Sequence, residues 1–430
     1  MMRPLATSNV RRQRRRIAVL AAPRYGASNM SAKPVFAFDA DRLAKLRHRL
    51  HRIPELGYQE FKTAAVIREE LSRLNIDFVA GTADAPTATI AHLGDLSKPC
   101  VALRADIDAL PITEQTGLAY ASTHEGVMHA CGHDGHTSVL LGAAEALLQI
   151  ESTLPVCVKL IFQPAEEGGG GAQRLVRAGV LDGTIGPKAV ADFGLHGWPG
   201  LPVGAVSTKP GPVLAATDTF EVRFIGAGCH GAFPHLGRDP IVTACEAVLN
   251  LQQFVSREID PTEPAVVTVG VFNAGTATNV IPDVARIAGT ARTLTPAARE
   301  HIARAIRRRC DAIAAANECR VEFAWTDGYP PTINDARMTA YVEHIARHTL
   351  GDTAFVPAQR PAMGGEDFAY YLEAVPGCFF FLGVVPVGRD AYPPLHSDRF
   401  DFTDAALGVG VRMFVNLVRL YPIEGELLAK

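Results

Sequence analysis

Two kinds of segment alternate over residues 39–210: longer ones in which apolar residues recur at helical spacing, and short ones that are almost wholly apolar. In residues 137–150, Val139, Leu140, Ala143 and Leu147 fall on one face of a helix. Short, almost wholly apolar runs between such segments are typical of buried strands. This alternation predicts an α/β fold with a mostly parallel central sheet and covering helices. The predicted helices are 39–50, 63–74, 137–150 and 172–179, and the predicted strands are 100–105, 156–162 and 189–195.

A different pattern begins after the proline- and glycine-rich residues 209–212. Strand-like and helix-like segments follow in the order β-α-β-β-α-β, which is typical of a ferredoxin-like α+β unit. We interpret residues 214–327 as a domain inserted into the first one. Its predicted strands are 219–225, 265–272, 285–293 and 320–325, and its predicted helices are 240–255 and 296–316.

The first domain then resumes, so it comprises residues 33–213 and 328–430. A helix at 338–350, a very apolar strand at 378–384 and a helix at 403–420 are expected to rejoin its sheet.

The first 38 residues carry eight Lys or Arg and no acid before Asp39. Such a stretch cannot bury a core, so we expect residues 1–32 to be a disordered extension. A targeting signal, or a true start at Met30, are the alternatives.

Composition narrows the class of partner. The chain has 430 residues, 20% charged residues and a net charge of −3, so its charge gives no reason to expect nucleic acid as a partner. No apolar run approaches the roughly 18 residues of a membrane-spanning helix. The eight cysteines include no CxxC pair. We therefore expect a cytoplasmic protein with a small-molecule substrate, and neither nucleic acid nor membrane as a partner.

The densest chemical signal is MHACGHDGH at residues 128–136. Cys131 and His133, which flank one glycine in a turn, can face a common point, and both are good ligands for first-row metals. The alternative is an ordinary helix start with a buried cysteine and a hydrogen-bonded histidine.

A second signal is FQPAEEGGGGA at residues 162–172, where Glu166 and Glu167 end a strand. Adjacent acids in an extended segment point in different directions, so one can bind a metal while the other serves as general base. A surface pair is the alternative. Phosphate binding is disfavoured, because no lysine of a GxxxxGK[ST] loop follows.

Three more candidates follow strands: Asp106, His196 and His396. The carboxyl ends of parallel strands meet at one edge of a sheet, so these side chains are expected to converge with the cysteine and the glutamates. A shared thiolate, three imidazoles and one carboxylate suffice for two metals with three ligands each. Asp106 either orients a ligand histidine or pairs with Arg104.

Six motifs in order, RADIDALP, MHACGHDGH, FQPAEEGGGGA, LHGWP, GGEDFAYY and PLHSDRFDF, resemble the di-metal aminoacylase/carboxypeptidase superfamily. The resemblance is to its N-acyl-amino-acid amidohydrolase branch, which includes hippurate hydrolases and auxin-conjugate hydrolases, and it spans residues 40–420. It implies that Cys131 bridges two metals and that Glu166 is the base and later the proton donor. The remaining implied ligands are His133 and His196 on one metal, and Glu167 and His396 on the other.

The resemblance also assigns the inserted domain as a lid that forms a homodimer or higher homo-oligomer. His230 matches a histidine that stabilises the oxyanion, and Asn279 and Arg292 match residues that hold the substrate carboxylate or assist the oxyanion. A turn residue and an exposed strand residue are the alternatives for the last two. Glu366 and Asp367 are expected to be supporting residues.

The implied activity is hydrolysis of N-acyl amino acids, hippurate-like or N-acetylated, to a carboxylic acid and a free amino acid. Two divalent ions per subunit are implied, manganese or zinc, with cobalt and nickel as alternatives. A metallo-dipeptidase or carboxypeptidase, an N-acetyl-diaminopimelate deacetylase and a catalytically silent binding protein are the rival hypotheses. The apolar residues 233–236 hint at a hydrophobic acyl group.

Overall fold

The computed structural model describes residues 36–389 and 391–422, all of which belong to one compact unit. The extension predicted for residues 1–32, with its alternatives, lies outside these residues. Within the described ranges, no helix is both long and apolar enough to cross a membrane. All eight cysteines are free thiols.

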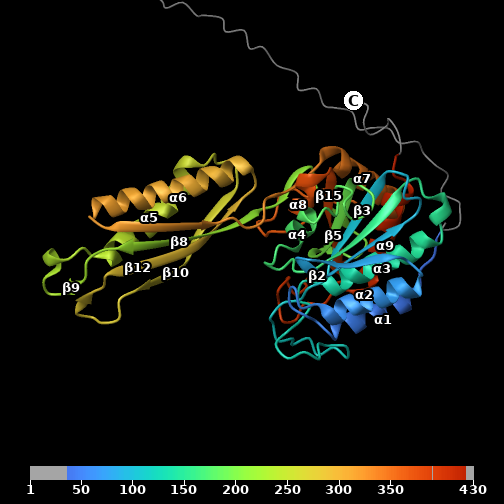
Figure 1. Cartoon of the computed structure of the whole chain (residues 1–430), viewed down its shortest axis with the longest axis horizontal. Coiled ribbons are helices and arrows are strands. Elements are labelled where there is room, and N and C mark those ends of the chain that lie inside the picture. The colour runs from blue at the N-terminus through green and yellow to red at the C-terminus, as the bar shows by residue number, and fades with distance from the viewer. Residues whose placement is uncertain (1–35, 390, 423–430) are drawn as a thin grey trace, which may run out of the picture. The chain divides into compact units, whose positions relative to one another are not determined.

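A seven-stranded sheet carries the predicted site (Figure 1). Its strands are β1 (Phe78–Thr82), β2 (Ala85–Leu93), β3 (Cys100–Asp106), β4 (Cys157–Gln163), β5 (Ala189–Pro202), β6 (Val206–Ser207) and β15 (Gly377–Val385). They follow the order β1-β2-β4-β3-β5-β15-β6. Strands β4, β3, β5 and β15 run parallel, and the other three pair antiparallel at the edges. The predicted mostly parallel sheet is therefore confirmed.

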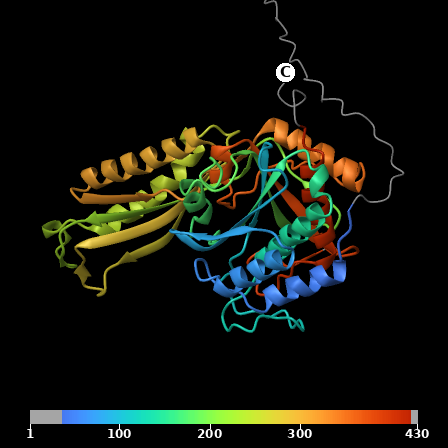
Figure 2. The same ribbon diagram turned by 45° about the vertical axis from the view of Figure 1, so that its right-hand side comes forward.

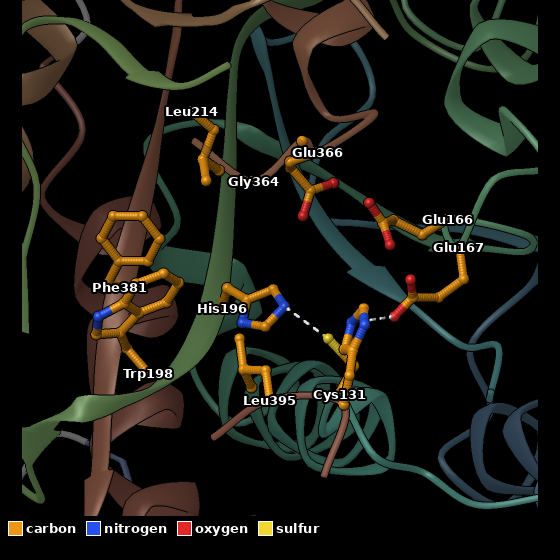
Figure 3. Close-up of a pocket in the computed structure, with 12 residues that line it drawn as sticks. Cys131, Glu166, Glu167, His196, Trp198, Leu214, Gly364, Glu366, Phe381 and Leu395 are labelled. Atoms are coloured by element: carbon orange, nitrogen blue, oxygen red, sulfur yellow. Dashed lines mark hydrogen bonds and ion pairs between the residues drawn. The ribbon is translucent and has the colours of Figure 1, made fainter. Parts of the chain in front are cut away.

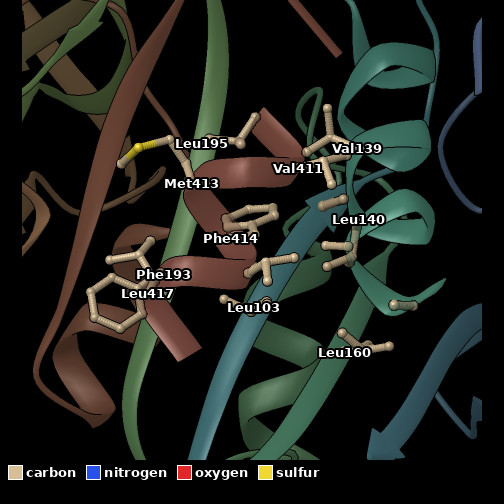
Figure 4. Packing of buried hydrophobic residues seen from close by; sticks show 14 of the residues in the cluster. Leu103, Val139, Leu140, Leu160, Phe193, Leu195, Val411, Met413, Phe414 and Leu417 are labelled. Atoms are coloured by element: carbon tan, nitrogen blue, oxygen red, sulfur yellow. The ribbon is translucent and has the colours of Figure 1, made fainter. Parts of the chain in front are cut away.

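Helices cover both faces of this sheet. Successive side chains of β3 point to opposite faces, so Leu103 and Ala102 belong to different apolar clusters. Leu103 packs with Leu140 and Phe414 (Figure 4). The Leu103 cluster draws on α1 (Ala40–His51), α2 (Phe61–Arg73), α3 (His133–Leu148), α7 (Ala336–Leu350) and α9 (Asp404–Arg419), and the Ala102 cluster draws on α4 (Gly171–Arg177) and α8 (Ala369–Ala374).

Helix α3 begins one turn earlier than its predicted start at residue 137. Its first turn is His-Asp-Gly-His, which has no apolar periodicity, so the hydrophobic pattern placed the start too late. Gly132 precedes the helix in the left-handed conformation, at φ 85°. Consequently His133 lies on the first turn of a helix, whereas Cys131 stays in the preceding loop.

A second, antiparallel sheet has the order β10-β12-β8-β13. Its elements are β8 (Ala216–Ile225), α5 (Pro240–Glu258), β10 (Ala265–Ala274), β12 (Val284–Thr293), α6 (Pro296–Ala316) and β13 (Arg320–Thr326). The β-α-β-β-α-β connection matches the ferredoxin-like prediction, and α5 and α6 pack on one face around their own apolar cluster (Figure 2). Because the described residues form one compact unit, the domain boundaries at 214 and 327 stay predictions.

The two connections between the sheets also pair with each other. Strand β7 (Gly211–Leu214) precedes the second sheet, and β14 (Thr332–Asn334) follows it, and the two run antiparallel. The sequence pattern missed both because they are too short to show a period. The remaining short elements are η1 (Glu151–Thr153), β9 (Cys229–His230), η2 (Pro234–Leu236) and β11 (Val280–Ile281).

We expect Gly135→Ala to destabilise the protein. A Cβ at Gly135 would overlap the ring of Phe402, whose nearest atom would lie 2.4 Å away. Overpacking of this kind costs roughly 1–3 kcal/mol, which urea unfolding would measure. The control is Gly270→Ala, where a Cβ meets no atom within 4 Å and stability should not fall. Equal stability of both variants would contradict the packing described here.

Candidate metal centre

The strand ends converge on one pocket of about 310 Å³. Strand β4 leads into the loop that carries Glu166 and Glu167, and His196 stands on β5. His396 reaches the same pocket from the segment between β15 and α9. Figure 3 shows Cys131 and His196 facing each other, with the glutamates on one side and aromatic rings on the other.

Cys131, His133 and His196 form the first cluster of potential metal ligands, with ligand atoms within 4.8 Å of one another. The Sγ of Cys131 lies 3.3 Å from Nε2 of His196. The other ring nitrogen of His196 lies 2.9 Å from the carbonyl oxygen of Gly197. A carbonyl only accepts, so Nδ1 carries the proton and Nε2 offers its lone pair to the cluster.

His133 is oriented in the same way by a carboxylate. Its Nδ1 lies 3.2 Å from Oδ1 of Asp108, while its buried Nε2 has no hydrogen-bond partner among the described residues. Burial lowers the pKa of His133, but the carboxylates of Asp106 and Asp108 outweigh burial and raise it to about 10. A cation that binds Nε2 must therefore displace a proton.

Cys131, Glu167 and His396 form the second cluster, again with ligand atoms within 4.8 Å. Nε2 of His396 lies 3.1 Å from Oε1 of Glu167. His396 and Ala165 both adopt the left-handed conformation, with φ of 63° and 53°. Non-glycine residues in this region store strain that the surrounding structure must hold in place. Cys131 thus belongs to both clusters, as a bridging ligand would.

Acidic side chains outnumber basic ones at this site. Burial and the carboxylates of Glu366 and Glu167 raise the pKa of Glu166 well above its usual range. Burial likewise raises the pKa of the Cys131 thiol, and both adjacent glutamates add to the shift. Two divalent cations would relieve this excess of negative charge, so the donor set fits a dinuclear site. The buried or half-buried acids here are Asp106, Asp108, Glu166, Glu167, Glu366 and Asp367.

Asp106 contacts Arg104 and His136. Its Oδ2 accepts from Nη1 of Arg104 at 2.8 Å, and its Oδ1 lies 2.6 Å from Nδ1 of His136. Nε2 of His136 accepts from the backbone of Gly197 at 2.8 Å, so neither nitrogen of His136 is left for a metal. Asp108, whose carboxylate contacts Nδ1 of His133, was not predicted from the sequence. The signal that could have indicated it is its position in the motif RADIDALP, two residues after Asp106.

The predicted lid residues do not line this pocket. His230 pairs with Val280 in the β9–β11 ribbon, and the next residue, Gly231, donates to the carbonyl of Asn279 at 2.8 Å. His230 and Asn279 are therefore neighbours and exposed, whereas Arg292 is half-buried on β12. The roles assigned to these three residues stay predictions.

We expect Asp108→Asn to weaken metal binding. The two oxygens of Asp108 hold Nδ1 of His133 and the backbone N–H of Glu167, and an amide can keep only one of these contacts. Loss of such a supporting contact typically lowers metal affinity about 10- to 100-fold, measurable by competition with a chelating dye. Exposed Asp95→Asn is the control. Unchanged affinity in Asp108→Asn would contradict this role.

Comparison with known proteins agrees with the fold. Residues 102–420 match the model of peptidase family M20/M25/M40. The chain is 44% identical over 343 residues to an N-acetyl-L-cysteine deacetylase of Bacillus subtilis (strain 168), covering 80% of each chain. It is 38% identical over 388 residues to IAA-amino acid hydrolase ILR1-like 4 of Arabidopsis thaliana, covering 89% of this chain and 86% of the relative.

A solved structure extends the likeness to three dimensions. The YXEP protein of Bacillus subtilis, described as a dinuclear metal binding peptidase from the M20 family, is 37% identical with a TM-score of 0.77. The match covers 89% of this chain and 97% of that chain. The resemblance seen in the six sequence motifs is thereby confirmed. The chain belongs to peptidase family M20/M25/M40 and is a hydrolase.

Proposed function

We propose that this enzyme hydrolyses N-acyl amino acids whose acyl group is large and apolar, releasing a carboxylic acid and a free amino acid. The observation that carries this proposal is the two-sided pocket, which sets the potential ligands and Glu166 against an apolar wall (Figure 3). The wall consists of Trp198, Leu214, Phe381 and Leu395.

The apolar wall supports a substrate with an aromatic or branched acyl group. The rings of Trp198 and Phe381 pack with centroids 4.4 Å apart, and Phe381 and Leu214 are buried. Burying an aromatic group against such a wall contributes through the apolar area removed from water. No Lys or Arg is among the described residues that line the pocket, which disfavours the N-acetyl diacid of a diaminopimelate pathway.

The two clusters are proposed to hold two divalent cations, manganese or zinc, with cobalt and nickel as alternatives. Imidazole, thiolate and carboxylate ligands suit these metals. His133 and His196 would serve one, Glu167 and His396 the other, and Cys131 both. When bound, the pair would polarise the substrate carbonyl and make a water molecule more acidic.

Glu166 is proposed to move the proton. Glu166 is buried and lines the pocket, and no hydrogen bond to its carboxylate is found among the described residues. The carboxylate would take a proton from the attacking water and then deliver it to the amine nitrogen as the amide bond breaks. By resemblance, His230 would stabilise the oxyanion, and Asn279 and Arg292 would hold the substrate carboxylate or assist the oxyanion.

We further propose a homodimer that forms through the second sheet. Strand β10 is an edge of that sheet and exposes Val266, Val271 and Phe272. An exposed apolar edge strand is a ready surface for pairing with another copy.

We also propose that the protein works in a reducing cytoplasm. The free thiols of all eight cysteines support this compartment.

Two variants, Glu166→Gln and Cys131→Ala, distinguish the role of the base from the role of a metal ligand. We expect Glu166→Gln to keep its metal content but to lose at least about 100-fold in kcat, because general acid–base catalysis contributes that much or more. Cys131→Ala should lose metal, since it removes a ligand common to both clusters. Metal analysis and steady-state kinetics would measure both, with exposed Glu125→Gln as control. A near-normal rate in Glu166→Gln would exclude Glu166 as the base.

A substrate panel tests the apolar wall. We expect N-benzoyl and indole-acyl amino acids to have a higher kcat/KM than N-acetyl amino acids, and Trp198→Ala to reduce this preference about 10- to 100-fold, because part of the wall is lost. Amine release from the panel, with free dipeptides included, gives the measurement. Cleavage of dipeptides alone would favour a metallo-dipeptidase or carboxypeptidase instead, and a preference for N-acetyl substrates would contradict the acyl assignment.

A further inference from the structure

Tyr329 joins the loop of Glu166 to the chain segment that returns from the second sheet. Tyr329 lies between β13 and β14, and its hydroxyl donates to the backbone carbonyl of Glu166 at 2.5 Å. The same hydroxyl accepts from the backbone N–H of Gly170 at 3.2 Å. One side chain therefore bridges two backbone groups of the glutamate loop.

The backbone of Glu166 matters because its carboxylate has no direct support. No hydrogen bond to that carboxylate is found among the described residues, so the hydrogen bonds that hold Glu166 are those of its peptide. The carbonyl of Glu166 accepts from the N–H of Gly168 at 2.7 Å as well as from Tyr329. Ala165, just before it, is in the left-handed conformation at φ 53°. A turn strained in this way needs contacts that fix it.

Tyr329 is itself firmly placed. Its N–H donates to Oγ1 of Thr217 at 3.0 Å, and the N–H of Thr217 donates to its carbonyl at 3.0 Å. The N–H of Gly328 donates to Oδ1 of Asp218, also at 3.0 Å. Thr217 and Asp218 are the second and third residues of β8, so the tyrosine is anchored where the chain enters the second sheet. Burial raises the pKa of Tyr329, so its hydroxyl stays protonated as a donor.

We propose that Tyr329 is a positioning residue for the reaction: its hydroxyl holds the peptide of Glu166 so that the carboxylate faces the reacting water and the amide. This inference rests on the proposed role of Glu166 as the base. It also means that the placement of the base depends on the segment between β13 and β14, which is anchored on β8, in addition to the strand that precedes Glu166.

Tyr329→Phe removes the hydroxyl and keeps the ring. We expect an unchanged metal content, a KM within about 2-fold of the wild type and a kcat about 10-fold lower, because a misplaced catalytic group slows the reaction more than it weakens binding. Hydrogen exchange at the amide of Gly170 should become faster, since that amide loses its acceptor. This second measurement does not depend on activity.

Tyr370→Phe is the matched control. The hydroxyl of Tyr370 donates to the carbonyl of Gly328 at 3.3 Å, so it supports the same segment without touching the glutamate loop. Its kcat and the exchange at Gly170 should match those of the wild type. If Tyr329→Phe does not fold, Thr217→Val removes the acceptor of the Tyr329 N–H and should lower kcat in the same direction.

A double-mutant cycle separates positioning from general support. If Tyr329 acts through the carboxylate of Glu166, Tyr329→Phe should cause no further loss in a Glu166→Gln enzyme. A further 10-fold loss there would overturn the proposal, and so would wild-type kcat and exchange in Tyr329→Phe while Glu166→Gln is impaired. Near-normal activity of Glu166→Gln itself would overturn the assignment of the base, and this proposal with it.

Discussion

Burial of the Arg104 guanidinium among carboxylates is the interaction on which the acidic pocket depends. The guanidinium of Arg104 donates to Asp106 at 2.8 Å and to Glu366 and Asp367 at 3.0 Å each. Its Nε donates to Gln163. Removing charged groups from water is costly unless they are paired and hydrogen-bonded. Arg104 therefore makes it possible to bury Asp106, Glu366 and Asp367 together. It makes no hydrogen bond to Glu166 or Glu167, the other two acids that line the pocket.

Other carboxylates of the site also contact two groups at once. Asp108 holds both His133 and the backbone of Glu167, one residue from each ligand cluster. Asp367 accepts from Arg104 and from the first turn of α4, so the strand-end arginine and the helix after the glutamate loop are tied together. Supporting contacts that serve two ligands at once make the geometry of the two clusters interdependent. A change in one cluster is then expected to affect the other.

The fold was largely predictable from the sequence, and the side chains that meet in the pocket were more predictable than the groups that support them. The spacing of the apolar residues predicted both ends of α6 correctly. It predicted the parallel strands to within a few residues, except for β5, which continues to Pro202. It placed the start of α3 too late, because that turn is polar. The contacts of Asp108 and Tyr329 depend on which backbone groups the folded chain brings within reach, and neither leaves a periodic signal. The strand pairs β7–β14 and β9–β11 were missed for the same reason.

The position of β15 within the sheet has a consequence for how the protein is made. Strand β15 lies between β5 and β6, and α9 packs against α3, yet both come from the last part of the chain. His396 lies between them in the sequence. During synthesis the ribosome delivers Cys131 and His133 long before it delivers the strand that completes the parallel core. The emerging chain must therefore keep the exposed edge of β5 from pairing with other chains until β15 has been synthesised and can cover it.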